Sequence, residues 1–561
     1  MSQTVGELLT STLAEVGANQ VFGVVGDALN AFTDAIRKDD RVKWLGVRHE
    51  EGAALAASGQ AKLTGRLGVC AGTTGPGATH LLAGLYEAAH DHAPVLAISG
   101  DVPTGKSGID YLQWADHVQA FRDASVYAAS ITSPEAAAGQ IHEAIATAYA
   151  RRGVALLNIP QDVFAAKTKA SSVLSPATLR QPPEIIPAAA DLDAAAALID
   201  GAKSVTLFVG YGGHGAASEI LALADKLKAP VVHTFRALDL FAFDDPRVVG
   251  GLGLIGSKAG FDAVRGCDVL VMVGSDYPYT EFLPQKAKVI QIDERGFAIG
   301  RRLPVAQALV GSARPAVEGL IARVGLKLED GFLTKTRKTW AGWQDMLDEK
   351  ADIGRSADRI HPQALARTVS DVANSDAVFV VDTGEVTLWT ANWLRPNGRQ
   401  PITGSFNNAA VGTALGQAIG IQALDPNRQV IAMCGDGGFA MLMQEFFTAT
   451  QHGLPIKCII FNNGGWGLVH LEMEEAGLPA FDGVKFKNPD FAMFAEACGG
   501  TGFRVTKPAD LKDTIARALV TPGPVVVDVA VDPAELPAMP HIEPAQVWKF
   551  GIGKARELFH T

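Results

Sequence analysis

The stretch QVIAMCGDGGFAMLMQEFFTATQHGLPIKCIIFNN, residues 429–463, decides how this chain folds. Its two apolar runs, residues 429–433 and 457–461, have the length and composition of buried strands. Between them, residues 438–455 are predicted to form one helix followed by a turn. A strand, a helix and a second strand in this order predict two neighbouring parallel strands, whose carboxyl ends meet at one edge of a sheet.

Polar residues follow both predicted strands. Gly435-Asp436-Gly437 comes after the first strand and Asn462-Asn463 after the second, with 24 residues between the two motifs. Glycines let a backbone approach a diphosphate closely, and Mg²⁺ prefers hard oxygen ligands such as a carboxylate or an amide oxygen. Either motif alone is more often an ordinary turn or loop. Together, at this spacing, they indicate a site for a metal and a diphosphate.

The same rhythm of short apolar runs and helical stretches extends over most of the chain. It predicts an α/β fold with three doubly wound, mainly parallel sheets. We place the domains at residues 1–175, 188–325 and 360–535, followed by a tail at residues 536–561. A Pro-rich segment, residues 175–187, is interpreted as a linker, and a polar stretch, residues 327–359, separates the second domain from the third.

Composition excludes several other classes of protein. Of 561 residues, 48% are hydrophobic and 19% are charged, which is typical of a large globular protein. The net charge of −11 and the absence of a basic run argue against a nucleic-acid partner. The five cysteines form no C-x-x-C pair, so neither a zinc site nor a disulfide framework is expected. No apolar segment reaches the roughly 18 to 20 residues that span a bilayer, and we expect a soluble protein.

A pair of acidic residues marks a second candidate site. Glu50 and Glu51 follow Arg48-His49, directly after a strand expected over residues 43–47, and small residues come next. An acidic pair in this position is usually only a favourable charge at a helix N-terminus. The presence of the metal motif in the same chain makes Glu50 a candidate for catalysis.

Together, these motifs resemble those of thiamine-diphosphate enzymes. The resemblance runs nearly end to end and is nearest to pyruvate oxidases of the pyruvate:quinone oxidoreductase type. Acetolactate synthases and 2-oxo-acid decarboxylases share the fold and both motifs, so they remain alternatives. The matching stretches are VRHEE at 47–51, VCAGTTGPG at 69–77, HAPVLAISG at 92–100, GLIG at 253–256, QID at 291–293, GSFN at 404–407 and MCGDGGFAMLM at 433–443.

The resemblance implies roles for the three domains, which would bind the pyrimidine, a flavin nucleotide and the diphosphate in that order. Asp436, Asn463 and the backbone carbonyl of Gly465 would be the Mg²⁺ ligands. Glu50 would stand against N1′ of the aminopyrimidine, where an apolar pocket raises the proton affinity of a carboxyl group. Relatives supply these two sets of residues from different subunits. The resemblance therefore implies at least a homodimer, and a homotetramer is expected.

Other site residues are carried over from the same resemblance. Val411 would lie under the thiazolium, and an ordinary core position for this valine is an equally good interpretation. Gln113 and Glu472 match catalytic positions that handle the substrate carboxylate and proton transfers. Three nearby histidines are interpreted as structural or surface residues, namely His80, His90 and His92.

The middle domain carries the features that imply FAD. Gly253 and Gly256 of the GLIG stretch, Gly274 and Asp293 match positions that contact the flavin nucleotide in relatives. Two departures put fast electron transfer in doubt, because rings that lie between thiamine and flavin in relatives are replaced by Leu112 and Leu468, although Trp466 stands nearby.

The implied reaction is decarboxylation of pyruvate or a similar 2-oxo acid. The enamine that results could be oxidised through FAD to acetate, with a quinone or oxygen as acceptor, and we favour this oxidation. Two alternatives stay open, namely protonation of the enamine and its attack on a second carbonyl, as in acetolactate synthases.

Relatives that dock on membranes have a longer amphipathic C-terminal segment, whereas residues 548–559 form a short mixed segment. We expect a cytoplasmic location, and peripheral contact with the inner face of the membrane stays open.

Overall fold

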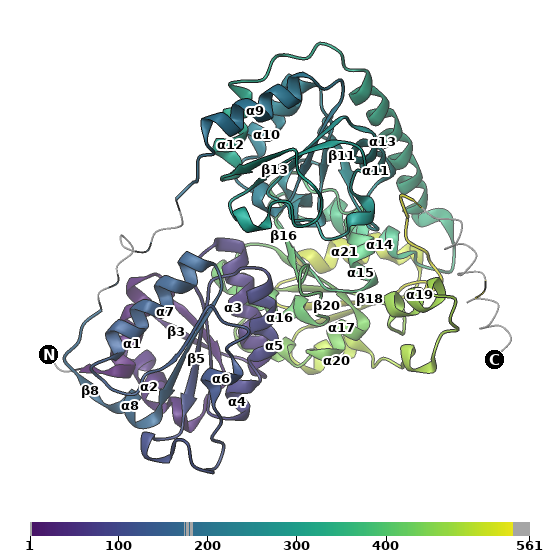
Figure 1. Cartoon of the computed structure of the whole chain (residues 1–561). Helices are drawn as coiled ribbons and strands as arrows, with labels where there is room; N and C mark the ends of the chain where they lie inside the picture. The colour runs from purple at the N-terminus through teal and green to yellow at the C-terminus, as the bar shows by residue number, and fades with distance from the viewer. Residues whose placement is uncertain (1–2, 173, 175–178, 180–182, 542–551, 553–561) are drawn as a thin grey trace.

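The computed structural model describes residues 3–172, 174, 179, 183–541 and 552. It contains three α/β units, each built on a six-stranded sheet in which all neighbouring strands run parallel. In Figure 1 the N-terminal unit lies at lower left, the middle unit at the top and the C-terminal unit at lower right. The predicted fold class is confirmed. Most of the segment interpreted as a linker lies outside the described residues.

The N-terminal sheet has the strand order β3-β2-β4-β5-β7-β6. Its strands are β2 (Gln20–Gly23), β3 (Lys43–Gly46), β4 (Gly68–Gly72), β5 (Val95–Asp101), β6 (Tyr127–Ser130) and β7 (Val154–Pro160). Its helices are α1 (Val5–Glu15), η1 (Asp27–Leu29), α2 (Asn30–Lys38), α3 (Glu50–Thr64), α4 (Pro76–Thr79), α5 (Leu82–His90), η2 (Thr104–Lys106), α6 (His117–Ala120), α7 (Ala137–Arg151) and α8 (Gln161–Ala165). Two short strands, β1 (Gln3–Thr4) and β8 (Lys167–Thr168), pair antiparallel beside it.

The middle sheet has the order β11-β10-β9-β12-β13-β14. Its strands are β9 (Val205–Val209), β10 (Val231–His233), β11 (Val248–Gly251), β12 (Val269–Val273), β13 (Lys288–Asp293) and β14 (Gln307–Val310). Its helices are α9 (Ala189–Asp200), η3 (Tyr211–Gly213), α10 (Ala217–Leu227), η4 (Phe235–Leu240), α11 (Lys258–Gly266), η5 (Thr280–Phe282), η6 (Gly296–Ala298) and α12 (Ala313–Ile321). The polar stretch that follows contains a long helix, α13 (Gly331–Lys350), and a short one, η7 (Ile353–Arg355).

The C-terminal sheet has the order β16-β15-β17-β18-β20-β19. Its strands are β15 (Val378–Val381), β16 (Ile402–Gly404), β17 (Val430–Gly435), β18 (Lys457–Asn462), β19 (Thr501–Val505) and β20 (Val525–Ala530). Its helices are α14 (Pro362–Val372), α15 (Glu385–Trp393), α16 (Thr413–Leu424), α17 (Asp436–Met441), α18 (Glu445–Gln451), α19 (Gly467–Glu475), η8 (Asp482–Val484), α20 (Phe491–Ala497) and α21 (Pro508–Val520).

The prediction of a single helix between the two decisive strands is wrong. The segment forms two helices, α17 and α18, because the backbone leaves helical geometry at Leu442, where φ is −129° and ψ is 27°. Both α17 and α18 contact α16. The strands themselves pair in parallel as predicted, with Gly435 opposite Phe461.

Strand order in the C-terminal sheet places a ligand site. From β15 the chain passes to β16 on one side and then to β17 on the other side of β15. In open α/β sheets, ligands bind outside the carboxyl ends of the strands where the order reverses in this way. The ends of β15 and β17 are therefore the expected position of a ligand.

Helices α3 and α16 pack against each other and join the N-terminal unit to the C-terminal unit (Figure 1). The α16 helix is buried along almost its whole length. Small residues allow the close approach, because Gly416 lies against Leu55 and Gly420 against the backbone carbonyl of Ala56. Any side chain at Gly420 would collide with that carbonyl.

A buried ion cluster ties all three units together. Lys62 on α3 pairs with Glu87 and, at 2.5 Å, with Asp91. Burial lowers the pKa of Lys62, but the two carboxylates outweigh that effect and raise it above its usual value. Arg236 of the middle unit reaches Asp91 at 3.3 Å. Three further contacts connect the cluster to the C-terminal unit, namely Lys62 to the carbonyl of Gly404 at 2.9 Å, Ser405 to Glu87, and Gln417 to Glu87 at 3.1 Å.

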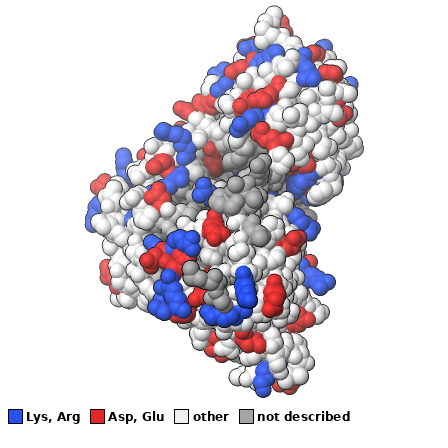
Figure 2. All heavy atoms as spheres, turned by 90° about the vertical axis from the view of Figure 1, so that its left-hand side faces the viewer, with Lys and Arg blue, Asp and Glu red and all other residues white. Residues whose placement is uncertain are grey.

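The surface charge is mixed. On the face shown in Figure 2, Lys and Arg lie interspersed with Asp and Glu. On α2, for example, Asp34 pairs with both Arg37 and Lys38. Within the described residues, no helix is both long and apolar enough to cross a membrane. The mixed segment at residues 548–559, Ile552 excepted, lies outside those residues.

We predict that Gly420→Ala destabilises the protein, because the added methyl group meets the backbone of Ala56 in a fully packed crossing. Overpacking of this kind costs about 1–3 kcal/mol. The matched control is Gly342→Ala in the exposed middle of α13, where a Cβ meets nothing within 4 Å and where alanine should stabilise by about 0.5–1 kcal/mol. Urea unfolding followed by circular dichroism measures both. Equal unfolding midpoints for the two variants would contradict the role given to the helix crossing.

Candidate active site

Asp436 lies at the end of β17, as the first residue of α17. Its side chain is buried, with 2% of the residue exposed. The carboxylate accepts hydrogen bonds from the Gly464 N–H at 2.7 Å, from the Asn488 side-chain amide at 2.7 Å and from the Gly437 N–H at 2.8 Å. Burial raises the pKa of Asp436, and these hydrogen bonds oppose the rise.

Asn463 follows β18 at the same edge of the sheet. Its side-chain Nδ2 donates to Glu385 Oε2 at 2.8 Å, and its Oδ1 accepts from the Gly465 N–H at 3.1 Å. The turn of residues 463–465 also bonds to Asp436 through Gly464. The structure therefore brings Asp436 and the turn of residues 463–465 together at adjoining strand ends, and their role as Mg²⁺ ligands stays a prediction.

A third strand end adds two acidic residues that the sequence analysis missed. Asp382 follows β15, and Glu385 begins α15 three residues later. Burial raises the pKa of each carboxyl group to about 7, although hydrogen bonds oppose the rise in both cases. Asp382 Oδ1 accepts from the backbone N–H groups of Gly412 and Thr413, whereas the buried Oδ2 has no hydrogen-bond partner among the described residues. The sequence signal was available, because Asp-Thr-Gly directly follows the predicted strand 377–381.

Two glycines at the reversal of strand order border open space. Gly384 has a φ of 129°, a conformation that side chains rarely adopt, and a Cβ on it would meet nothing within 4 Å. A Cβ on Gly435 would likewise meet nothing within 4 Å. Gly384 precedes Glu385 and Gly435 precedes Asp436, so both glycines adjoin a donor set of carboxylate and amide oxygens, the ligands that suit Mg²⁺ together with phosphate oxygens. The residues therefore fit a divalent cation with a diphosphate.

Val411 lies at the border of this site. It is half-buried in the turn before α16, and its Cγ1 would be 3.3 Å from a Cβ on Gly438. Gly437, the residue before Gly438, lies against the ring of Trp466. The turn that carries Val411 is held by Asp382, which accepts from the Gly412 N–H at 2.9 Å.

Glu50 lies in the N-terminal unit, at the first position of α3. Only 7% of the residue is exposed, and its Oε2 is 2.9 Å from Nδ1 of His80. The His80 ring stacks on His49 at a centroid distance of 4.5 Å. On the other side of the carboxyl group, Oε1 would be 3.1 Å from a Cβ on Gly77. His80, interpreted as a structural or surface histidine, is half-exposed and contacts the candidate catalytic carboxyl group.

Glu445 of the C-terminal unit holds the chain just before Glu50. Its buried carboxylate accepts from the N–H of His49 at 2.8 Å and from the N–H of Arg48 at 3.1 Å. Thr448 donates to the same carboxylate at 2.6 Å. Burial raises the pKa of Glu445, and these hydrogen bonds oppose the rise. No local pattern in the sequence points to this contact.

Gln113 lies in an exposed loop of the N-terminal unit. It adopts a φ of 62°, uncommon for a residue with a side chain, and its carbonyl lies close to Gly75. The buried His117 accepts from the Gly75 N–H at 3.1 Å and is held in turn by Asn158 at 3.0 Å. Glu472 is exposed on α19. Among the described residues, no hydrogen bond or ion pair joins Glu472 to Gln113 or to Glu50.

The middle unit brings its own candidate residues together. Gly274 directly follows β12 at the reversal of strand order, and its carbonyl accepts from the Gly212 N–H at 3.0 Å. Tyr277 donates to the carbonyl of Leu252 at 3.2 Å, which holds the turn of Gly253 and Gly256 against this segment.

Asp293 ends β13 and pairs with Arg295, whose guanidinium also reaches His92 Nε2 at 3.2 Å. His92 itself has a φ of 55°. The neighbouring His90 offers its carbonyl to the Asn407 side chain at 3.0 Å. His92 therefore connects two units through its ring, and His90 through its backbone.

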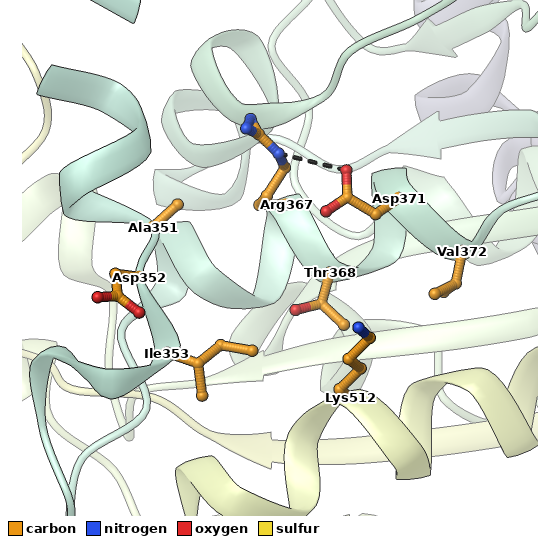
Figure 3. A pocket seen from close by; sticks show the side chains of 8 residues that line it. All are labelled: Ala351, Asp352, Ile353, Arg367, Thr368, Asp371, Val372 and Lys512. Carbon is orange, nitrogen blue, oxygen red and sulfur yellow. Dashed lines mark ion pairs between the residues drawn. The ribbon is translucent and has the colours of Figure 1, made fainter. Parts of the chain in front are cut away.

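A cavity of about 250 Å³ lies away from these strand ends (Figure 3). It is formed by η7, α14 and α21, and charged side chains of both signs line it, among them Arg367, Asp371 and Lys512. Arg367 is already paired with Asp371 at 3.3 Å. None of the residues predicted from the sequence lines this cavity.

Comparison with known proteins gives matches over all three units. Residues 3–121 match the thiamine pyrophosphate enzyme N-terminal TPP binding domain, residues 192–320 the central domain and residues 382–529 the C-terminal TPP binding domain. A putative thiamine pyrophosphate-containing protein of Bacillus subtilis, YdaP, is 38% identical over 531 residues, 94% of this chain and 92% of the relative.

Two relatives with named activities are also similar. A pyruvate oxidase of Lactiplantibacillus plantarum is 30% identical over 537 residues, which cover 94% of this chain and 88% of the relative. An acetolactate synthase large subunit of Corynebacterium glutamicum is 30% identical over 570 residues, which cover 97% and 88%.

We predict that Asp382→Asn stabilises the cofactor-free protein more at pH 8 than at pH 5. The folded pKa of about 7 exceeds the model-peptide value of 3.8, so the stability that this carboxyl group contributes is lost as the pH rises between those values. A neutral amide at this position has no such loss. Urea midpoints measured from pH 5 to pH 8 test this, with Asp330→Asn at an exposed position as the control. A difference from wild type that does not grow with pH would contradict the prediction.

Proposed function

Because this chain belongs to the thiamine pyrophosphate enzymes, we propose that it decarboxylates pyruvate or a similar small 2-oxo acid with thiamine diphosphate and Mg²⁺. We further propose that the remaining two-carbon fragment is oxidised through FAD to acetate. One observation carries the cofactor assignment. Asp436 and Asn463 meet at adjacent strand ends, beside open space where the strand order reverses.

Residues of the C-terminal unit would hold the cofactor. Asp436, Asn463 and the carbonyl of Gly465 would bind Mg²⁺, and the open sides of Gly384 and Gly435 would admit the diphosphate. Val411 would lie against the ring system. When bound, thiamine diphosphate supplies the electron sink that loss of CO₂ requires.

Glu50 would keep a proton at the pyrimidine ring. Its burial and its contact with His80 fix the carboxyl group in one position. Within the described residues of one chain, no hydrogen bond or ion pair joins Glu50 to Asp436 or Asn463. We therefore propose that a second copy of the chain completes the site, in a homodimer or a homotetramer. Gln113 and Glu472, both exposed in a single chain, would then contact substrate across that interface.

The oxidative step has separate support. A pyruvate oxidase is among the relatives, and the segments proposed to contact FAD, Gly253–Gly256 and Gly274–Pro278, meet through Tyr277. The acceptor would be a quinone, which requires contact with the inner face of the membrane, or oxygen in the cytoplasm. A non-oxidative decarboxylase or an acetolactate-synthase-like carboligase is the alternative. An acetolactate synthase relative and the replaced rings at Leu112 and Leu468 favour it.

We expect Glu50→Gln to lower turnover of pyruvate by at least about 100-fold, because positioned proton transfer contributes 10²–10⁴-fold to rate. Glu51→Gln, at the next position of α3, is the matched control and should retain activity. CO₂ release measures turnover, and circular dichroism checks that both variants fold. Full activity in Glu50→Gln would remove the role proposed for this carboxyl group.

The fate of the two-carbon fragment can be read from colour and product. We expect the purified protein to be yellow, to bleach when pyruvate is added without oxygen, and to release acetate when a quinone is supplied. Leu112→Phe should bleach faster, because it restores a ring on the proposed path, whereas Leu112→Ile should not. A colourless protein that forms acetaldehyde or acetolactate would refute the oxidative proposal and support the alternative.

A further inference from the structure

We propose that Glu385 is a positioning residue of the cation site, which keeps the oxygen of the Asn463 amide, rather than its nitrogen, turned toward a divalent cation. This inference rests on the proposed function, because it takes Asn463 as a Mg²⁺ ligand. Glu385 lies at the start of α15, on a different strand-to-helix connection from either proposed ligand. Its role does not follow from the G-D-G and N-N motifs.

The hydrogen-bond pattern around Asn463 carries the proposal. An amide side chain has a donor end and an acceptor end that differ little in size, so its neighbours decide which end faces a ligand. Nδ2 of Asn463, which can only donate, donates to Glu385 Oε2 at 2.8 Å. The donor end is therefore held by Glu385, and Oδ1 is turned to the side of the Gly465 N–H, at 3.1 Å.

The packing around Glu385 is built for this contact. A Cβ on Gly467 would overlap the Glu385 carboxyl group and would be 2.7 Å from Nδ2 of Asn463. The absence of a side chain at Gly467 therefore leaves room for the carboxylate beside the amide. Partners that orient a metal ligand through a hydrogen bond typically change metal affinity 10–100-fold when they are removed.

A purely structural role would have different consequences. An acidic residue at the first position of a helix is also a favourable charge for that helix, and its loss would lower stability without changing affinity for a cation. Affinity for Mg²⁺ therefore separates the two roles. Trp466, whose ring lies against Gly437 of the metal motif, provides a fluorescence signal close to the site.

The test uses the full-length protein, stripped of metal and held in excess thiamine diphosphate, with Mg²⁺ titrated and followed by tryptophan fluorescence and by calorimetry. We expect Glu385→Ala to raise the Kd for Mg²⁺ at least about tenfold. Glu385→Gln retains a carbonyl oxygen that can accept from Asn463, and it should stay within about threefold of wild type. Gly467→Ala, which displaces the carboxyl group from the other side, should weaken Mg²⁺ binding as Glu385→Ala does.

Two results would overturn the inference. One is wild-type affinity for Mg²⁺ in both Glu385→Ala and Gly467→Ala. The other is an equal loss in Glu385→Gln and Glu385→Ala, which would show that charge acts at this position and orientation does not. Failure of the proposed function gives a different result, because the wild-type protein itself would then show no Mg²⁺-dependent binding of thiamine diphosphate.

Discussion

The close crossing of α3 and α16 is the constraint on which the rest of the structure depends. Each helix begins at the candidate site, α3 with Glu50 and α16 two residues after Val411. Because glycines bring the two backbones into contact, neither helix can slide without moving the start of the other. The crossing therefore fixes where one chain presents the Glu50 carboxyl group relative to its own loop at Val411. Glu445 reinforces that placement by accepting from the backbone just before Glu50.

Residues close in sequence to a strand end could be predicted from the sequence, and residues brought in by tertiary contacts could not. The alternation of apolar runs and helical stretches was sufficient to predict three parallel sheets. The expected pairing of two successive strands was sufficient to predict that Asp436 and Asn463 lie close together. Glu385 contacts Asn463 across 78 positions and Glu445 contacts Arg48 across 397. Neither leaves a local pattern. The break at Leu442 was missed because helix-forming residues lie on both sides of it, in α17 and in α18.

Three acidic side chains gather where β15 and β17 end in the C-terminal sheet. Asp382, Glu385 and Asp436 stand at the ends or starts of adjoining elements, and burial raises the pKa of each. Among the described residues, backbone N–H groups and side-chain amides donate to these three groups, and no cationic side chain pairs with them. Such an edge carries an electrostatic cost in the empty protein, because carboxylates that share a site repel one another. A divalent cation would offset that cost, which is the electrostatic reason for a metal between this edge and an anionic diphosphate.

The ion cluster around Lys62 limits how the three units of such a protein can be exchanged between relatives during evolution. Lys62, Glu87 and Asp91 of the N-terminal unit take partners from both other units, and the N- and C-terminal units also share one hydrophobic core. Replacing the middle unit with that of a distant relative would remove Arg236 from Asp91, and replacing the C-terminal unit would remove the hydrogen bonds that Lys62 and Glu87 make with residues 404–417. Buried charged groups that lose their partners are strongly destabilising. Each unit has its own sheet, yet the contacts of the cluster require the three units to keep matching residues. A working chimera would have to carry residues 404–424 along with the N-terminal sheet.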